Sequence, residues 1–205
     1  VSHIEAHESA PDGVVRTLDL SKESLVATAV AGDAILCRFN APLIETAYEF
    51  IGQGIGVRVE GREIGAGLKA LVRRWQSKSF DALLTNLEKF ENREVAKYRA
   101  KEQESRAVSV EDKVRCIRIL INRVQATQPT VSDVVGAVCD QIDLIFKEQP
   151  GVPVVLLSTG REWKKVIWLN HAETSKWARM EWEHQAEINL RYVAATRAKH
   201  ELVLA

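Results

Sequence analysis

Runs of apolar residues mark the strands that the first and last parts of the chain predict. The segments 57–59 and 201–204, which contain Arg58 and Glu201, also predict strands, and uninterrupted apolar runs lie at 34–37, 152–157 and 166–169. Strands that are buried on both faces of a parallel sheet show such runs, without alternation of apolar and polar positions. After the first run, apolar residues recur at helical spacing up to Ile51, with Asn40 as the expected N-cap and Gly52 as the end. Strand, helix and strand in this order predict a βαβ unit.

Helical periodicity dominates the middle of the chain, and one more helix is predicted at 181–198. Four helices are predicted in the middle zone. The first covers about 66–75, and the others begin near Ser79, at Ser109 and at Thr130. The last two starts place Asp112 and Asp133 three residues after the hydroxyl, which is a capping-box pattern. The predicted fold class is therefore α/β. Residues 1–64 and 151–205 share one parallel sheet, and an all-helical insertion at 65–150 interrupts it.

Composition narrows the class of protein. The 205 residues are 46% hydrophobic and 27% charged, as in an ordinary globular protein. No apolar run reaches the ~18 residues of a membrane span, and the polar first residues exclude a signal peptide. The chain does not begin with Met, so we expect it to be a piece of a longer protein. Its three distant cysteines favour a reduced, cytoplasmic protein, and the histidine spacing predicts no metal site.

The net charge is zero but unevenly distributed. Residues 1–64 carry five Lys and Arg against ten Asp and Glu, whereas 65–150 carry fifteen against twelve and 151–205 eight against six. Nucleic-acid contacts would therefore come from local side chains rather than from a basic field. One basic cluster surrounds Trp75 and consists of Lys69, Arg73, Arg74 and Lys78. Such a cluster can follow a phosphate backbone, but it is more often a solvated helix face.

Two glycine-rich stretches, 52–56 and 61–67, do not predict nucleotide binding. Neither ends in the Gly-Lys-Ser/Thr of a P-loop. The first follows a predicted helix, where glycine normally provides a C-cap and a turn.

Three segments carry a resemblance to a known family. Residues 192–199, Tyr-Val-Ala-Ala-Thr-Arg-Ala-Lys, resemble motif VI of the UvrD-like superfamily 1 DNA helicases, whose pattern is Tyr-Val-x-x-Thr-Arg-Ala. Residues 34–41 are similar to the strand that ends in Arg-Thr-Asn in that family. Residues 156–159, with Glu162 and the run from 166, resemble the flanks of motif V. All three occur in the family's order, and together they span nearly the whole chain.

The resemblance implies a C-terminal RecA-like domain, with a parallel sheet and helices on both faces. ATP with Mg²⁺ would be bound mainly by an N-terminal RecA-like domain of the same polypeptide, so the present chain alone should be inactive. Arg197 would be the arginine finger, and Glu162 would contact the nucleotide ribose. The family positions that grip single-stranded DNA near a duplex junction match Arg38, Asn40 and Thr159. Arg197 should then lie at the surface, near the tips of the strands.

One departure from the family leaves an alternative open. The His-x-x-Lys-Gly element of motif V is missing between Thr159 and Glu162. Either this loop has been deleted or a segment is missing from the chain, and we favour the second explanation. A true deletion favours a non-catalytic DNA-binding or protein-interaction module derived from a helicase fold. An unrelated α/β regulatory domain would require the three ordered matches to be coincidence.

Overall fold

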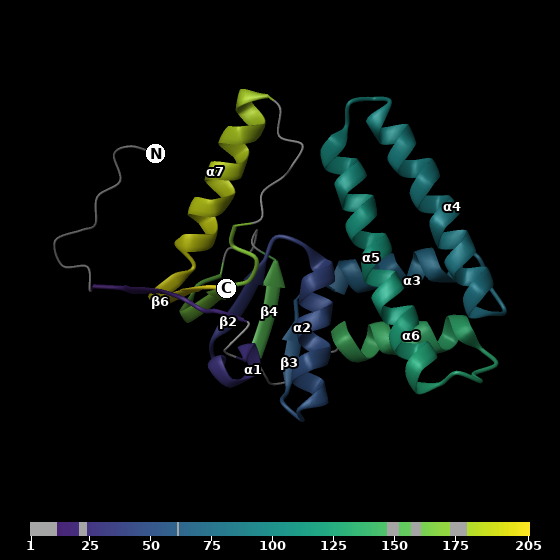
Figure 1. Cartoon of the computed structure of the whole chain (residues 1–205), viewed down its shortest axis with the longest axis horizontal. Helices are drawn as coiled ribbons and strands as arrows, with labels where there is room; N and C mark the ends of the chain where they lie inside the picture. Colours follow the sequence, from purple (N-terminus) through teal and green to yellow (C-terminus); the bar gives the residue numbers. More distant parts are fainter. Residues whose placement is uncertain (1–11, 21–23, 61, 147–151, 157–160, 173–179) are drawn as a thin grey trace.

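A single parallel sheet organises the chain. The computed structural model describes residues 12–20, 24–60, 62–146, 152–156, 161–172 and 180–205. Within these residues, six strands pair in the order β1-β6-β5-β2-β4-β3, and every pairing is parallel (Figure 1). The strands are β1 (Val14–Thr17), β2 (Ala34–Cys37), β3 (Val57–Val59), β4 (Val152–Leu156), β5 (Trp163–Trp168) and β6 (Ala198–Leu204). The α/β class with a parallel sheet is thus confirmed.

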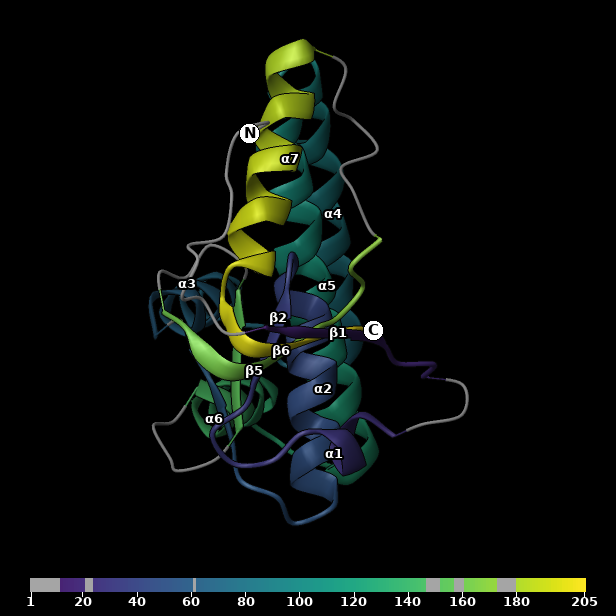
Figure 2. The same ribbon diagram turned by 90° about the vertical axis from the view of Figure 1, so that its left-hand side faces the viewer.

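Helices cover both faces of the sheet, as strand β2 shows. Its four residues are fully buried and alternate between two apolar clusters. Ala34 and Leu36 belong to the cluster with α7 (Glu181–Ala195), while Ile35 and Cys37 belong to the larger cluster with α2 (Asn40–Gly52). Figure 2, turned by 90° from Figure 1, shows α7 on one side of strands β5 and β6 and α2 on the other. Burial on both faces explains the unbroken apolar run of this strand.

The helical insertion lies between β3 and β4 and packs onto the sheet through α2. It consists of α3 (Arg62–Arg73), α4 (Phe80–Arg99), α5 (Glu104–Thr127) and α6 (Val134–Phe146). One apolar cluster runs from the strands through α2 into these four helices. The Tyr48 hydroxyl of α2 also donates a hydrogen bond to Gln141 of α6 at 3.1 Å. In Figure 1 the insertion occupies one end of the molecule and α7 lies toward the other. The insertion is therefore joined to the sheet by a common core.

Two predicted helix starts are wrong. Helix α5 begins at Glu104 rather than Ser109, and α6 begins at Val134 rather than Thr130. At the start of α6, Asp133 itself accepts from the backbone nitrogen of Gly136 at 2.8 Å, so its carboxylate provides the cap. The start after Ser79 is confirmed, because the Ser79 hydroxyl accepts from the nitrogen of Ala82.

Two short elements were not predicted, and one helix begins earlier than expected. Strand β1 and the four-residue helix α1 (Leu25–Thr28) precede the first predicted strand. Helix α3 begins at Arg62, although its periodicity predicted a start near residue 66. Strands β5 and β6 also begin three residues before the apolar runs that predicted them. These extra residues bring the start of β5 beside the start of β6.

Candidate functional site

Glu162 and Arg197 lie side by side where β5 and β6 begin. Trp163 pairs with Ala198 in the parallel ladder, and its backbone nitrogen donates to the carbonyl of Arg197 at 2.9 Å. Arg197 occupies the tight turn between the end of α7 at Ala195 and the start of β6. The structure thus brings together the two residues for which the resemblance implies ATP contacts.

The Arg197 side chain is held at the C-terminus of α7. Its Nε donates to the carbonyl of Val193 at 2.9 Å, and its Nη2 donates to the Thr196 hydroxyl at 3.0 Å. Carbonyls at a helix C-terminus favour a positive charge, so the helix end stabilises this guanidinium. The residue is half-buried at the strand tips and does not enter either apolar cluster. This is the location that the sequence predicted for Arg197.

Glu162 makes a loose and solvated ion pair. Its Oε2 lies 3.7 Å from the Nζ of Lys199, and the two side chains are 46% and 57% exposed. Such a pair contributes little to stability, because water screens both charges. The carboxylate can therefore exchange Lys199 for another partner at little cost.

Arg38 lies at the opposite edge, directly after β2, and it is already paired. Its Nη1 and Nη2 donate to the two carboxylate oxygens of Glu187 in α7, each at 2.6 Å. The side chains are only 21% and 16% exposed. A bidentate pair of this kind is stronger than an ordinary surface ion pair. Arg38 thus joins the carboxyl end of β2 to the helix on one face of the sheet.

Asn40 does not cap α2 as expected, because it is the first residue of that helix and Phe39 occupies the N-cap. The cap comes instead from Asp112 of α5. The Asp112 carboxylate accepts from the Asn40 nitrogen at 3.0 Å, from the Asn40 side-chain amide at 2.8 Å and from the Ala41 nitrogen at 3.0 Å. A carboxylate at a helix N-terminus satisfies the free amide groups there. Asp112 therefore docks the insertion onto α2 and does not cap its own helix.

The predicted site residues thus lie at opposite ends of the parallel strands. We call the end where the strands begin the amino edge, and the end where they finish the carboxyl edge. Because all strands are parallel, Glu162 and Arg197 share the edge where strands begin. Arg38 and Asn40 share the edge where strands end. Thr159, the remaining predicted DNA-binding residue, lies outside the described residues. Sequence reasoning missed Asp112 and Glu187 as partners, since 72 and 149 positions separate them from Asn40 and Arg38.

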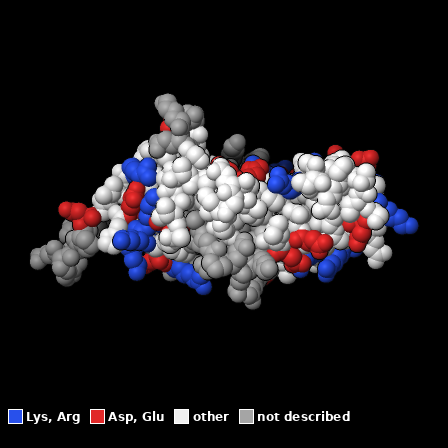
Figure 3. Space-filling model, turned by 90° about the horizontal axis from the view of Figure 1, so that it is seen from below, with Lys and Arg blue, Asp and Glu red and all other residues white. Residues whose placement is uncertain are grey.

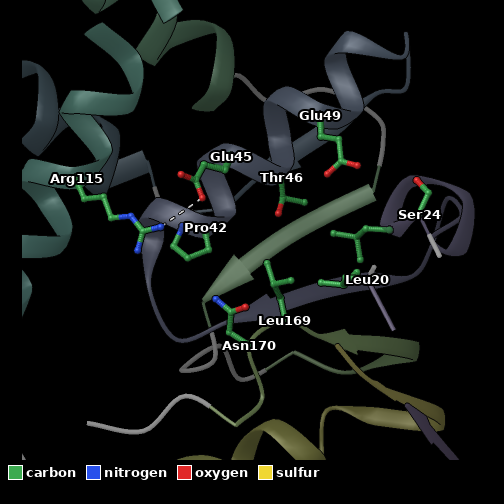
Figure 4. A pocket seen from close by; sticks show the side chains of 10 residues that line it. Leu20, Ser24, Pro42, Glu45, Thr46, Glu49, Arg115, Leu169 and Asn170 are labelled. Carbon is green, nitrogen blue, oxygen red and sulfur yellow. Dashed lines mark ion pairs between the residues drawn. The ribbon is translucent and has the colours of Figure 1, made fainter. Parts of the chain in front are cut away.

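A cavity of about 550 Å³ opens at the carboxyl edge, beside the first turns of α2 (Figure 4). From β2 the chain passes through α2 to β3, which lies on one side of β2 in the sheet. From β5 it passes through α7 to β6, which lies on the opposite side. Helices α2 and α7 cover opposite faces of the sheet. The ends of β2 and β5 therefore form a topological switch point, where ligands bind in open α/β sheets. Leu169 and Asn170, which directly follow β5, line the cavity. No pattern in the sequence indicated this cavity, because its walls come from distant segments.

Three of the four basic residues around Trp75, namely Arg73, Arg74 and Lys78, are exposed at the surface. Trp75 packs edge to face on Phe90 with ring centroids 5.9 Å apart, and Lys69 pairs with Asp143 at 2.5 Å. The view in Figure 3 shows Lys and Arg interspersed with Asp and Glu at both ends of the molecule. These contacts support the interpretation of the cluster as a solvated helix face.

The three cysteines are buried and form no disulfide. Burial, together with the nearby charge of Asp112, raises the pKa of the Cys116 thiol. Within the described residues, no three His, Cys, Asp or Glu side chains are grouped so that they could hold a metal ion. None of the helices described combines the length and the apolar character required to cross a bilayer.

Comparisons with known proteins do not assign the chain to a family. No protein-family model matches its sequence, and no curated protein matches it either.

Proposed function

We propose that this chain is the C-terminal part of the motor of a UvrD-like, ATP-dependent DNA helicase that translocates on single-stranded DNA. The observation that carries the proposal is the position of Arg197. It belongs to a segment that resembles motif VI, and it lies at the strand tips next to Glu162, the residue that resembles the motif V glutamate. Two residues matched by separate motifs thus meet at one edge of one sheet.

The chemistry of this edge fits a nucleotide bound by a neighbouring domain. ATP and Mg²⁺ would be held mainly by an N-terminal RecA-like domain of the same polypeptide, and hydrolysis supplies the free energy for movement. A guanidinium close to the γ-phosphate stabilises the charge on the transferring phosphoryl group, which contributes on the order of 10³-fold or more in rate. The Glu162 carboxylate can accept a hydrogen bond from a ribose hydroxyl. Arg197 and Glu162 therefore supply complementary contacts to two parts of ATP.

The opposite edge provides the grip on DNA in this proposal. Guanidinium and amide groups such as those of Arg38 and Asn40 donate hydrogen bonds to phosphate oxygens. In the structure both donate to carboxylates, of Glu187 and Asp112. DNA binding would therefore replace one anionic partner by another. Because the nucleotide and the single-stranded DNA contact different edges of the sheet, rotation of the sheet against the N-terminal domain would move the DNA-binding residues Arg38 and Asn40.

A specific observation favours the second candidate, a non-catalytic DNA-binding or interaction module. Strand β4 ends at Leu156 and β5 begins at Trp163, yet β2 lies between these parallel strands in the sheet. The connecting residues 157–162 are about half of the dozen that a parallel crossover usually contains. The family's His-x-x-Lys-Gly element would lengthen this connection. A protein that truly lacks it would keep the fold while losing part of the motor.

We place the protein in the cytoplasm, because its three thiols are buried and unlinked. The membrane has no role in this proposal, and the partners are single-stranded DNA, a duplex junction and the N-terminal domain.

The decisive experiment replaces Arg197 by Ala in the longer polypeptide that carries the N-terminal domain. We expect DNA-stimulated ATP turnover to fall by about 10³-fold while ATP affinity changes little, because the guanidinium acts on the transition state. Arg191→Ala, on the exposed side of the same helix, is the matched control and should keep full turnover. Unchanged turnover in Arg197→Ala would contradict the assignment. Measurable hydrolysis by the 205-residue chain alone would contradict the division of the site between two domains.

A further inference from the structure

The cavity at the carboxyl edge contains a buried hydroxyl, that of Thr46. Thr46 of α2 lines the cavity and is only 5% exposed. Among the described residues, none donates a hydrogen bond to its hydroxyl or accepts one from it. In Figure 4 the Thr46 side chain points from α2 toward the side where Leu169 lies. Buried hydroxyls in native proteins nearly always have a partner, either a protein group or an ordered water, so this hydroxyl is available for a hydrogen bond with a ligand in the cavity.

Two carboxylates flank that hydroxyl on the same helix. Glu45 and Glu49 are one turn apart, at a spacing where like charges repel each other. Among the described lining residues, Arg115 of α5 is the basic one, and it lies 3.6 Å from Glu45 with both side chains at least half exposed. The described lining residues thus carry two carboxylates against one guanidinium, and the contact between Arg115 and Glu45 is loose. A ligand with a positive charge would relieve the repulsion.

The remaining wall is apolar. Pro42, Leu25 and Leu169 contribute to it, and all three are buried. Alkyl stems of amphipathic cations pack along such surfaces while their charged end remains at polar groups. The cavity therefore combines a surface for an aliphatic chain with a cluster of hydrogen-bond acceptors.

We infer that this cavity binds an aliphatic cation through a primary ammonium group. An ammonium has three N–H donors and no acceptor. The Thr46 hydroxyl and the carboxylates of Glu45 and Glu49 provide acceptors from one face of α2, while the stem packs against Pro42 and Leu169. An anion such as phosphate would meet two carboxylates here. The location at the topological switch point is where this class of sheet binds ligands, and the inference does not depend on the proposed helicase function.

The experiment titrates the 205-residue chain with cadaverine, a five-carbon diamine, followed by calorimetry and by the methyl resonances of Leu169. The uncharged isostere 1,5-pentanediol is the matched ligand control. Cadaverine should bind and shift these resonances, and pentanediol should bind at least tenfold more weakly. Equal binding of cadaverine and pentanediol would overturn the inference.

Variants test the named acceptors. Glu49→Gln and Thr46→Val should each weaken cadaverine binding at least tenfold, because each removes one acceptor from the ammonium. Thr46→Ser should retain binding, since it keeps the hydroxyl. Glu88→Gln, an exposed residue of α4, is the matched control and should bind as the parent does. Glu49 is exposed, so its variant should fold even if Thr46→Val does not. Undiminished binding by a folded Glu49→Gln protein would refute the site.

A second pair of probes distinguishes the source of the ammonium group. Nα-acetyl-lysine methylamide represents the side chain of a protein partner, whereas cadaverine represents a free polyamine. Tighter binding of the lysine derivative would identify a protein lysine as the ligand, and tighter binding of cadaverine would identify a polyamine. Tighter binding of either probe supports an ammonium site. Absence of binding by both probes would exclude such a site.

Discussion

The two edges of the sheet hold their predicted functional residues in different ways. At the amino edge, the contacts with described residues are those of Arg197 with the end of its own helix and that of Glu162 with Lys199 on the adjacent strand at 3.7 Å. At the carboxyl edge, Arg38 and Asn40 are bound by carboxylates that come from α7 and from the helical insertion. Among the described residues, the contacts at the amino edge are therefore local, whereas those at the carboxyl edge connect distant elements.

This difference separates chemistry from stability. Residues with local contacts can exchange partners without moving any other element. Residues that connect β2 to α7 and to α5 stabilise the arrangement of these helices, so any ligand that recruits them also loosens the fold. We therefore expect substitutions at the carboxyl edge to lower the free energy of unfolding, and substitutions at the amino edge to leave it nearly unchanged.

The largest effect on stability is expected for Asp112→Ala. This change leaves the Asn40 and Ala41 backbone nitrogens and the Asn40 amide without their acceptor. Loss of a cap together with unsatisfied donors should lower the free energy of unfolding by about 2–3 kcal/mol. The measurement is urea denaturation. The neighbouring Glu111→Ala removes only an exposed pair with Arg99 and should cost less than about 1 kcal/mol. Equal effects of the two changes would mean that Asp112 does not dock the insertion.

A smaller effect is expected from the pair of Arg38 and Glu187. A double-mutant cycle with Arg38→Ala and Glu187→Ala isolates their interaction from other losses. The bidentate geometry and the limited exposure of both side chains predict a coupling free energy of about 1 kcal/mol, at the upper end for ion pairs near the surface. A coupling free energy near zero would show that β2 is not joined to α7 through this contact.

The sheet could largely be predicted from the sequence, because burial on both faces leaves an unbroken apolar run. Strand β1 escaped prediction for the opposite reason. It lies at the end of the sheet, and its Val14 and Val15 are 58% and 66% exposed, between polar neighbours. The fold class therefore followed from the central strands, where the physical signal is strongest.

Helix starts were less predictable, because a capping pattern is local and the real partner can be distant. Ser109 and Asp112 have capping-box spacing, yet Asp112 binds the first turn of α2, 72 residues away. The residues of the candidate site also differ in whether the sequence indicated them. Motif order indicated Arg197 and Glu162, and the structure places them directly before the starts of two neighbouring strands, β6 and β5. The cavity had no such signal, because Thr46 resembles any helix residue until Leu169 and Arg115 are brought beside it.

The smallest effects on stability are expected for the amino edge, where the proposed effects on chemistry are largest. In the 205-residue chain, Arg197→Ala removes the two hydrogen bonds that this side chain makes to described residues at the helix end, and their loss should lower the free energy of unfolding by about 0.5 kcal/mol. Glu162→Gln should change it by less than about 0.5 kcal/mol, because its ion pair is solvated. Urea denaturation of both variants beside Asp112→Ala provides the comparison.

If Arg197→Ala destabilised the chain as much as Asp112→Ala does, the guanidinium would have a structural role. A loss of ATP turnover in the longer polypeptide would then no longer identify an arginine finger. A stable variant without turnover would instead assign Arg197 to the reaction itself.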